Sequence, residues 1–192
     1  LAFADVNVID DETVEQFSAV SFYPDGRLFI AYRGTDDSIA GWREDFRMAF
    51  LTPVPAQRHA EEYLTKAAQS FDGRIVIGGH SKGGNLALWA ALNASDEISE
   101  RTDKIYNFDG PGFLENVWEG ENYLRIADKF RTVIPSGSVV GLLLKYDTKY
   151  NAKRQNSCRY PAHSRYRGQY CIYTKTSFCC CLFHCFRHVL HA

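Results

Sequence analysis

A glycine-rich turn between a short apolar run and a helical run constrains this chain more than any other segment. The run Ile75–Ile77 is wholly apolar, as in a strand that is buried on both faces of a sheet. The Leu- and Ala-rich run 86–91 predicts a helix. Between them lies Gly79-His80-Ser81-Lys82-Gly83. A strand that turns sharply into a helix at Gly-x-Ser-x-Gly exposes the serine hydroxyl, so we expect Ser81 to be a nucleophile at the end of a parallel strand.

The rest of the chain before residue 150 alternates strand and helix signals. Pro24-Asp25-Gly26 lies between two β-rich runs and predicts an antiparallel hairpin. Apolar residues at helical spacing predict a helix that begins at Pro55 and ends before Asp72-Gly73. Besides 75–77, four runs are expected strands: 17–23, 28–32, 104–108 and 130–134. A hairpin followed by alternating strands and helices predicts an α/β fold with a mainly parallel sheet that helices cover on both faces.

Charge divides the chain near residue 150. All 23 acidic residues lie at or before Asp147, together with 14 of the 22 basic residues. The last 45 residues therefore carry eight basic residues and no acid, together with four of the six histidines. We interpret residues 1–150 as the folded core, truncated at its N-terminus because the chain begins at Leu1. Residues 151–192 are an atypical basic, Cys- and His-rich tail, either translated in a shifted reading frame or disordered.

Composition excludes several classes of function. Residues 1–147 contain no cysteine, so no disulfide framework is expected there. The chain has neither a leader pattern nor an apolar run of about 18 residues, which predicts a cytoplasmic protein without a transmembrane segment. In the tail, no Cys-x₂-Cys pair is matched by a second pair at the spacing of a zinc site, so we predict no bound metal. We also expect no cofactor and no nucleic-acid partner.

A second segment offers a hydrogen-bond donor that would stabilise negative charge near Ser81. Serine hydrolases stabilise the oxyanion with the amide that follows the nucleophile and with a second donor from a loop after an early strand. Here the first is the N–H of Lys82, and the second is Thr35, which follows the expected strand 28–32. The alternative is that Asp36 and Asp37 only cap a helix that begins near Ser38.

Several segments together resemble the Mbeg-like family of bacterial proteins, a branch near the class 3 lipases. The resemblance covers about residues 15–150 and implies an α/β-hydrolase fold, a Ser81 nucleophile and an oxyanion role for Thr35. It also implies acyl-ester chemistry on a small-molecule or lipid substrate. Five blocks carry it: Tyr32-Arg33-Gly34-Thr35-Asp36, Gly41-Trp42-Arg43-Glu44-Asp45-Phe46, Val54-Pro55-Ala56-Gln57, Gly79-His80-Ser81-Lys82-Gly83-Gly84-Asn85-Leu86-Ala87 and Tyr106-Asn107-Phe108-Asp109-Gly110-Pro111-Gly112-Phe113.

The rest of a catalytic triad is less defined. A serine nucleophile needs a histidine base and an orienting acid, in the chain order Ser, Asp, His. The turn after the expected strand 130–134 lacks the carboxylate that class 3 lipases carry there, which leaves Asp109 or Asp147. We favour Asp109, because it ends a strand at the same edge of the sheet as Ser81. His163, the first histidine after Asp109, is the candidate base.

The surroundings of His163 do not resemble the family's Gly-Ile-x-Gln-His-like block. Codons for Arg159-Tyr160-Pro161-Ala162-His163, read one base later, can encode Gly-Ile-Gln-His. We therefore expect the chain as written to be a poor catalyst. The alternative function is a catalytically degenerate α/β-hydrolase fold that acts as a binding or interaction module.

Overall fold

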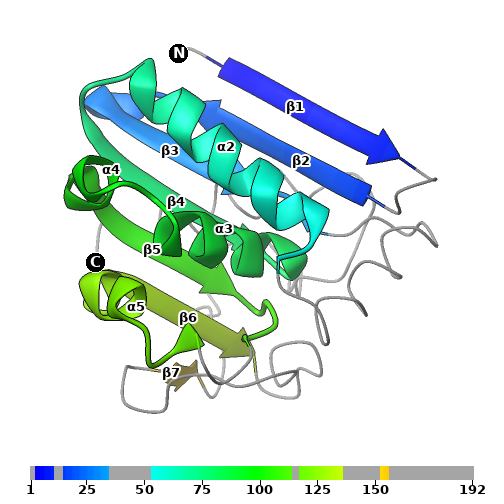
Figure 1. The fold of residues 1–192 in the computed structure, drawn as a ribbon, viewed down its shortest axis with the longest axis vertical. Coiled ribbons are helices and arrows are strands. Elements are labelled where there is room, and N and C mark those ends of the chain that lie inside the picture. Colours follow the sequence, from blue (N-terminus) through cyan, green and yellow to red (C-terminus); the bar gives the residue numbers. More distant parts are fainter. Residues whose placement is uncertain (1–2, 11–14, 35–52, 114–116, 136–151, 156–192) are drawn as a thin grey trace, which may run out of the picture. The chain divides into compact units, whose positions relative to one another are not determined.

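A computed structural model describes residues 3–10, 15–34, 53–113, 117–135 and 152–155. These residues form a sheet with helices on it (Figure 1). The strands are β1 (Phe3–Asp10), β2 (Glu15–Phe22), β3 (Arg27–Tyr32), β4 (Arg74–His80), β5 (Thr102–Phe108), β6 (Phe130–Pro135) and β7 (Ala152–Gln155). The helices are the 3-10 turn η1 (Pro24–Gly26), α2 (Pro55–Gln69), α3 (Lys82–Leu92), α4 (Asp96–Arg101) and α5 (Glu121–Ile126).

The seven strands lie in the sheet in the order in which they occur in the chain. The pairs β1–β2 and β2–β3 are antiparallel, and every pair from β3 to β7 is parallel. The sheet is therefore mainly parallel, and the carboxyl ends of β3, β4, β5 and β6 lie along one edge. This is the α/β-hydrolase-type arrangement that the sequence predicts, and that edge carries the site.

One face of the sheet packs against the helices. Every second residue of the central strands points into this core, which places Leu28 and Ile30 of β3 beside Ile75 and Ile77 of β4. Leu86 of α3 packs in the same core. In Figure 1, α2, α3 and α5 all lie in front of the strands. Burial of these side chains fixes how α3 lies on β4, and so fixes the turn that joins them.

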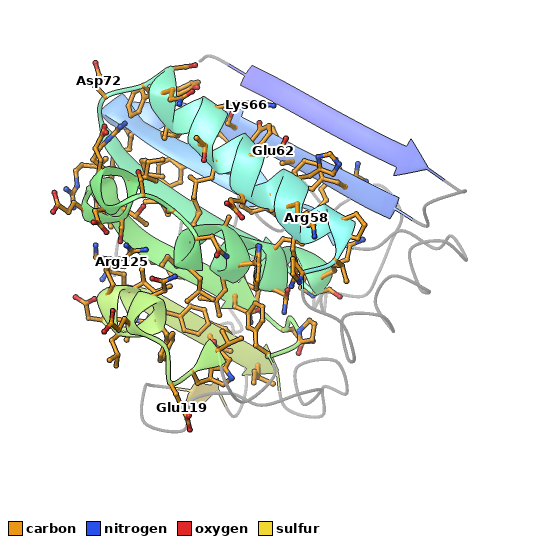
Figure 2. All side chains as sticks on the ribbon, in the orientation of Figure 1. Arg58, Glu62, Lys66, Asp72, Glu119 and Arg125 are labelled. Atoms are coloured by element: carbon orange, nitrogen blue, oxygen red, sulfur yellow. The ribbon has the colours of Figure 1, made fainter. Side chains whose placement is uncertain are left out.

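Helix α2 shows how the sequence pattern selects the buried face. Pro55 is its first residue, and the Val54 N–H donates to the Gln57 side-chain oxygen at 2.9 Å, which caps the start of the helix. Three charged residues at four-residue spacing, Arg58, Glu62 and Lys66, lie along the exposed side (Figure 2). The ion pair between Glu62 and Lys66 is exposed and contributes little to stability.

The structure confirms the predicted hairpin, the helix from Pro55 and the central strands. The turn at 24–26 is tight enough to hold Asp25 and Gly26 at positive φ, 51° and 72°. The sequence interpretation missed β1, α4, α5 and β7. Strand β7 lies beyond residue 150 and pairs in parallel with β6. On the face opposite the helices, Phe22 and Phe29 stack with ring centroids 5.4 Å apart. That helices also cover this face stays a prediction.

A first prediction concerns Tyr32, a fully buried residue of β3. Its hydroxyl donates to the Ala60 carbonyl at 2.9 Å, and burial raises its pKa well above 10. Tyr32→Phe removes this buried hydrogen bond and should lower the free energy of unfolding by about 1 kcal/mol in urea titrations. Tyr23→Phe is the control, because the Tyr23 ring packs on Phe71 and its hydroxyl has no hydrogen bond within the described part of the chain. Equal stabilities for the two variants would contradict the prediction.

Candidate active site

Ser81 lies at a strained turn between β4 and α3. Its φ of 54° and ψ of −131° belong to a region that residues with a side chain rarely adopt, and such a conformation costs on the order of 1–3 kcal/mol. Two backbone hydrogen bonds hold it. The Ser81 N–H donates to the Phe108 carbonyl at 2.9 Å, and the Gly84 N–H donates to the Ser81 carbonyl at 2.9 Å. The serine side chain does not cap α3, although it occupies the N-cap position.

The glycines on either side of Ser81 are required by close backbone contact. A Cβ on Gly79 would lie 2.3 Å from the carbonyl carbon of Gly83, and a Cβ on Gly83 would lie 2.2 Å from the Tyr32 carbonyl oxygen. Both of these atoms belong to the backbone, so a side chain at either position would have to displace the main chain. The Gly-x-Ser-x-Gly spacing therefore lets the start of α3 approach both β4 and β3.

The end of β3 lies against the turn at Ser81. A Cβ on Gly34 would lie 2.9 Å from the His80 carbonyl oxygen and 3.3 Å from the Cβ of Ser81. The chain therefore passes Ser81 at van der Waals distance just before residue 35. Thr35 itself, with Asp36 and Asp37, lies outside the described residues. Its oxyanion role stays a prediction.

Lys82 is the first residue of α3 and directly follows Ser81. The amides at the start of a helix point along the axis toward the site, and the helix dipole favours negative charge there. The oxyanion role of the Lys82 N–H stays a prediction. The Lys82 side chain is buried, with 2% of its surface exposed.

Asp109 occupies the equivalent place on the neighbouring strand. In the parallel register His80 of β4 pairs with Phe108 of β5, so Ser81 and Asp109 each follow the last residue of adjacent strands. Asp109 also has a positive φ, 55°, and its N–H donates to the Val133 carbonyl at 2.8 Å. Two of the three non-glycine residues with positive φ in the described part of the chain are thus at this edge.

His80 directly precedes Ser81 and pairs with Phe108, the residue before Asp109, and the charge of Asp109 affects its pKa. Burial lowers its pKa below the ordinary 6.5, and the negative charge of Asp109 opposes that shift. The imidazole is therefore mostly neutral near pH 7 and adds no positive charge beside Ser81.

Three buried amide side chains beneath the turn were missed by the sequence interpretation. Gln57, Asn85 and Asn107 are each 1% exposed. The sequence signal that could have found Asn85 is a polar residue at the start of an apolar helical run, four positions after Ser81. The other candidate triad residues, His163 and Asp147, lie outside the described residues.

A shallow hollow of about 380 Å³ opens near the other end of α3. It is lined by Trp89, Leu92, Asn93, Val117, Gly120, Glu121 and Asn122. At 1.5 Å of rise per residue, Trp89 is about 12 Å along the helix from Ser81. This hollow is therefore separate from the turn at Ser81. The described residues contain no group of acidic, histidine or cysteine side chains that could hold a metal ion.

Comparison with known proteins identifies the family. The sequence matches the Mbeg1-like family over residues 3–167. The chain belongs to the Mbeg1-like family. This confirms the resemblance seen in the sequence blocks around Ser81 and Asp109.

One solved structure similar to this Mbeg1-like protein is described as the crystal structure of M37 lipase. The two share 18% sequence identity with a TM-score of 0.47, and the match covers 70% of this chain and 53% of the lipase chain. The Mbeg1-like chain thus matches about half the length of that lipase. Among curated proteins the comparison finds no match.

Within the described residues, no helix has the length and apolar character needed to cross a membrane.

A second prediction tests the close packing of the turn. Gly83→Ala in this Mbeg1-like protein forces a Cβ into the Tyr32 carbonyl and should lower the free energy of unfolding by about 3 kcal/mol. Gly120→Ala is the matched control, because a Cβ there meets nothing closer than 3.7 Å and its φ is −75°. It should cost less than about 1 kcal/mol. Chemical unfolding measures both, and a Gly83→Ala variant as stable as Gly120→Ala would contradict the described packing.

Proposed function

We propose that this protein is a serine hydrolase of the lipase or esterase type, which cleaves an acyl ester through an acyl-enzyme on Ser81. The observation that carries the proposal is the strained conformation of Ser81 at a strand-to-helix turn. The surrounding fold holds the residue at φ 54° although its hydroxyl caps nothing. A strained conformation of this kind persists only where the surrounding packing holds it in place. Such strain is typical of a catalytic nucleophile at a strand-to-helix turn.

In the proposed reaction the Ser81 Oγ attacks the acyl carbonyl carbon while a histidine accepts its proton. The negative charge that develops on the carbonyl oxygen is stabilised by the Lys82 N–H and by Thr35. The ester C–O bond then breaks, and the histidine returns the proton to the leaving alcohol. Water, deprotonated by the same histidine, attacks the acyl carbonyl carbon. The bond between that carbon and Ser81 Oγ breaks, the acid leaves, and the histidine returns the proton to Ser81 Oγ.

Asp109 is the proposed orienting acid. Its support is its place one residue past the end of β5, next to the strand that carries Ser81, and the backbone bond that joins Ser81 to Phe108. Asp147 remains the alternative acid. The base is His163, or a histidine that the alternative reading frame would encode in its place.

A third prediction tests the nucleophile. A fluorophosphonate probe, which phosphonylates activated serines, should label the intact parent protein, in which residues 151–192 carry the native base, and Ser81→Ala should abolish the label. Ser70→Ala is the control, because the Ser70 hydroxyl is exposed and only donates to the Lys66 carbonyl at 3.1 Å. Intact-mass spectrometry reads the adduct. Equal labelling of the protein and its Ser81→Ala variant would end the assignment.

A fourth prediction tests the base through ester hydrolysis by three forms of the protein. Without an adjacent base, a serine at its ordinary pKa is a weak nucleophile, and oxyanion donors alone leave about 10³–10⁴-fold catalysis over water. We expect weak turnover by this chain and by its His163→Ala variant. A form with residues 151–192 encoded in the alternative frame should gain strongly. Robust turnover by this chain that His163→Ala abolishes would contradict the shifted frame and establish His163 as the base.

A further inference from the structure

Three buried amide side chains form hydrogen bonds under the turn at Ser81. Gln57 lies in the first turn of α2, Asn85 in α3 and Asn107 in β5. A buried amide costs free energy unless its polar atoms are bonded, so the partners of these side chains show what the cluster does.

The bonds run from α2 through α3 to the turn that follows β5. Gln57 Oε1 accepts from the Val54 N–H at 2.9 Å, and Gln57 Nε2 donates to Asn85 Oδ1 at 2.9 Å. Asn85 Nδ2 then donates to the Gly112 carbonyl at 2.9 Å and to the Pro111 carbonyl at 3.3 Å. Gln57 thus fixes the orientation of the Asn85 amide, because only its oxygen can face the Gln57 donor. The Asn85 NH₂ group is left to hold the turn.

The same turn is held from its other side. The Gly110 N–H donates to Asn107 Oδ1 at 2.8 Å. A Cβ on Gly110 would lie 2.4 Å from the Ser81 carbonyl oxygen, and a Cβ on Gly84 would lie 2.1 Å from Asn107 Oδ1. The turn 109–112 therefore contacts the backbone of Ser81 directly, with no side chain between them.

We propose that Asn85 is a positioning residue that binds the turn Asp109–Gly112 to the helix carrying Ser81, with Gln57 setting its orientation. Asp109 has φ 55° at the start of this turn, a conformation that a residue with a side chain keeps only under constraint. The two carbonyls that Asn85 holds belong to the second and third residues after it. The effect on the rate rests on the proposed hydrolase function, whereas the effect on the turn does not.

The first test is amide hydrogen exchange, which needs no activity. Asn85→Ala removes both bonds to the turn, so the amides of Asp109 and Gly110 should exchange at least about tenfold faster than in the unaltered protein. Asn93→Ala is the matched control: Asn93 is the same residue type at the end of the same helix, and its Nδ2 donates to the Trp89 carbonyl at 2.9 Å. Unchanged exchange at Asp109 and Gly110 in a folded Asn85→Ala protein would overturn the proposal.

The second test is the rate of Ser81-dependent ester hydrolysis. Small misplacements of catalytic groups cost about 10²-fold, so Asn85→Ala should lower kcat by that order while KM changes little. Asn93→Ala should retain the kcat of the unaltered protein. If neither the unaltered protein nor the form with residues 151–192 encoded in the alternative frame shows Ser81-dependent turnover, the hydrolase proposal fails and the exchange result decides the positioning role alone. If it turns over and Asn85→Ala keeps its kcat, the positioning role in catalysis is wrong.

Asn85→Asp tests the donor role of Asn85 through the pH dependence of kcat and of amide exchange. A purely structural role would leave that pH dependence unchanged. An aspartate keeps the volume and can still accept from Gln57 Nε2, but when ionised it has no hydrogen to donate to the Gly112 carbonyl. Protonation restores one donor. The ratio of variant to unaltered kcat should therefore rise as the pH falls, and the exchange of Gly110 should slow in parallel. A pH-independent ratio and exchange rate would contradict a role for the Asn85 donor.

Discussion

The turn at Ser81 depends on a backbone that approaches its neighbours more closely than side chains allow. The N–H of Ser81 is bound to β5, its carbonyl is bound within the first turn of α3, and the glycines on both sides touch the backbones of β3 and α3. Because every one of these contacts is between main-chain atoms, their geometry follows from how the strands pair and how α3 packs. The apolar core on the helix face therefore supplies the free energy that keeps Ser81 at positive φ.

The same arrangement concentrates chemistry at one edge of the sheet. Parallel pairing brings the ends of β3, β4 and β5 together, so Gly34, Ser81 and Asp109 are neighbours although they are far apart in the chain. The start of α3 favours negative charge there, and burial keeps His80 mostly neutral. Asn85 and Gln57 connect this edge to the helix layer. The site is thus supported by the sheet register, a helix terminus and a buried amide cluster.

Much of this could be predicted from local sequence. The apolar run at β4, the glycines around Ser81 and the helical run after it form one continuous signal, and the hairpin at Pro24 has its own turn chemistry. The short helices α4 and α5 were missed because six residues give too little periodicity to detect. The contact between Asn85 and the turn at Gly112 could not be predicted, since it joins residues 27 positions apart through tertiary packing.

The measurement that tests the account most directly is to trap the covalent intermediate. The protein would be mixed with an activated short-chain ester, quenched in acid within the first turnover, digested and mapped by mass spectrometry. The account predicts that the acyl group is found on the peptide containing Ser81, that Ser81→Ala carries none, and that hydrolysis falls with it. An acyl group on another residue, or hydrolysis that Ser81→Ala leaves unchanged, would contradict it.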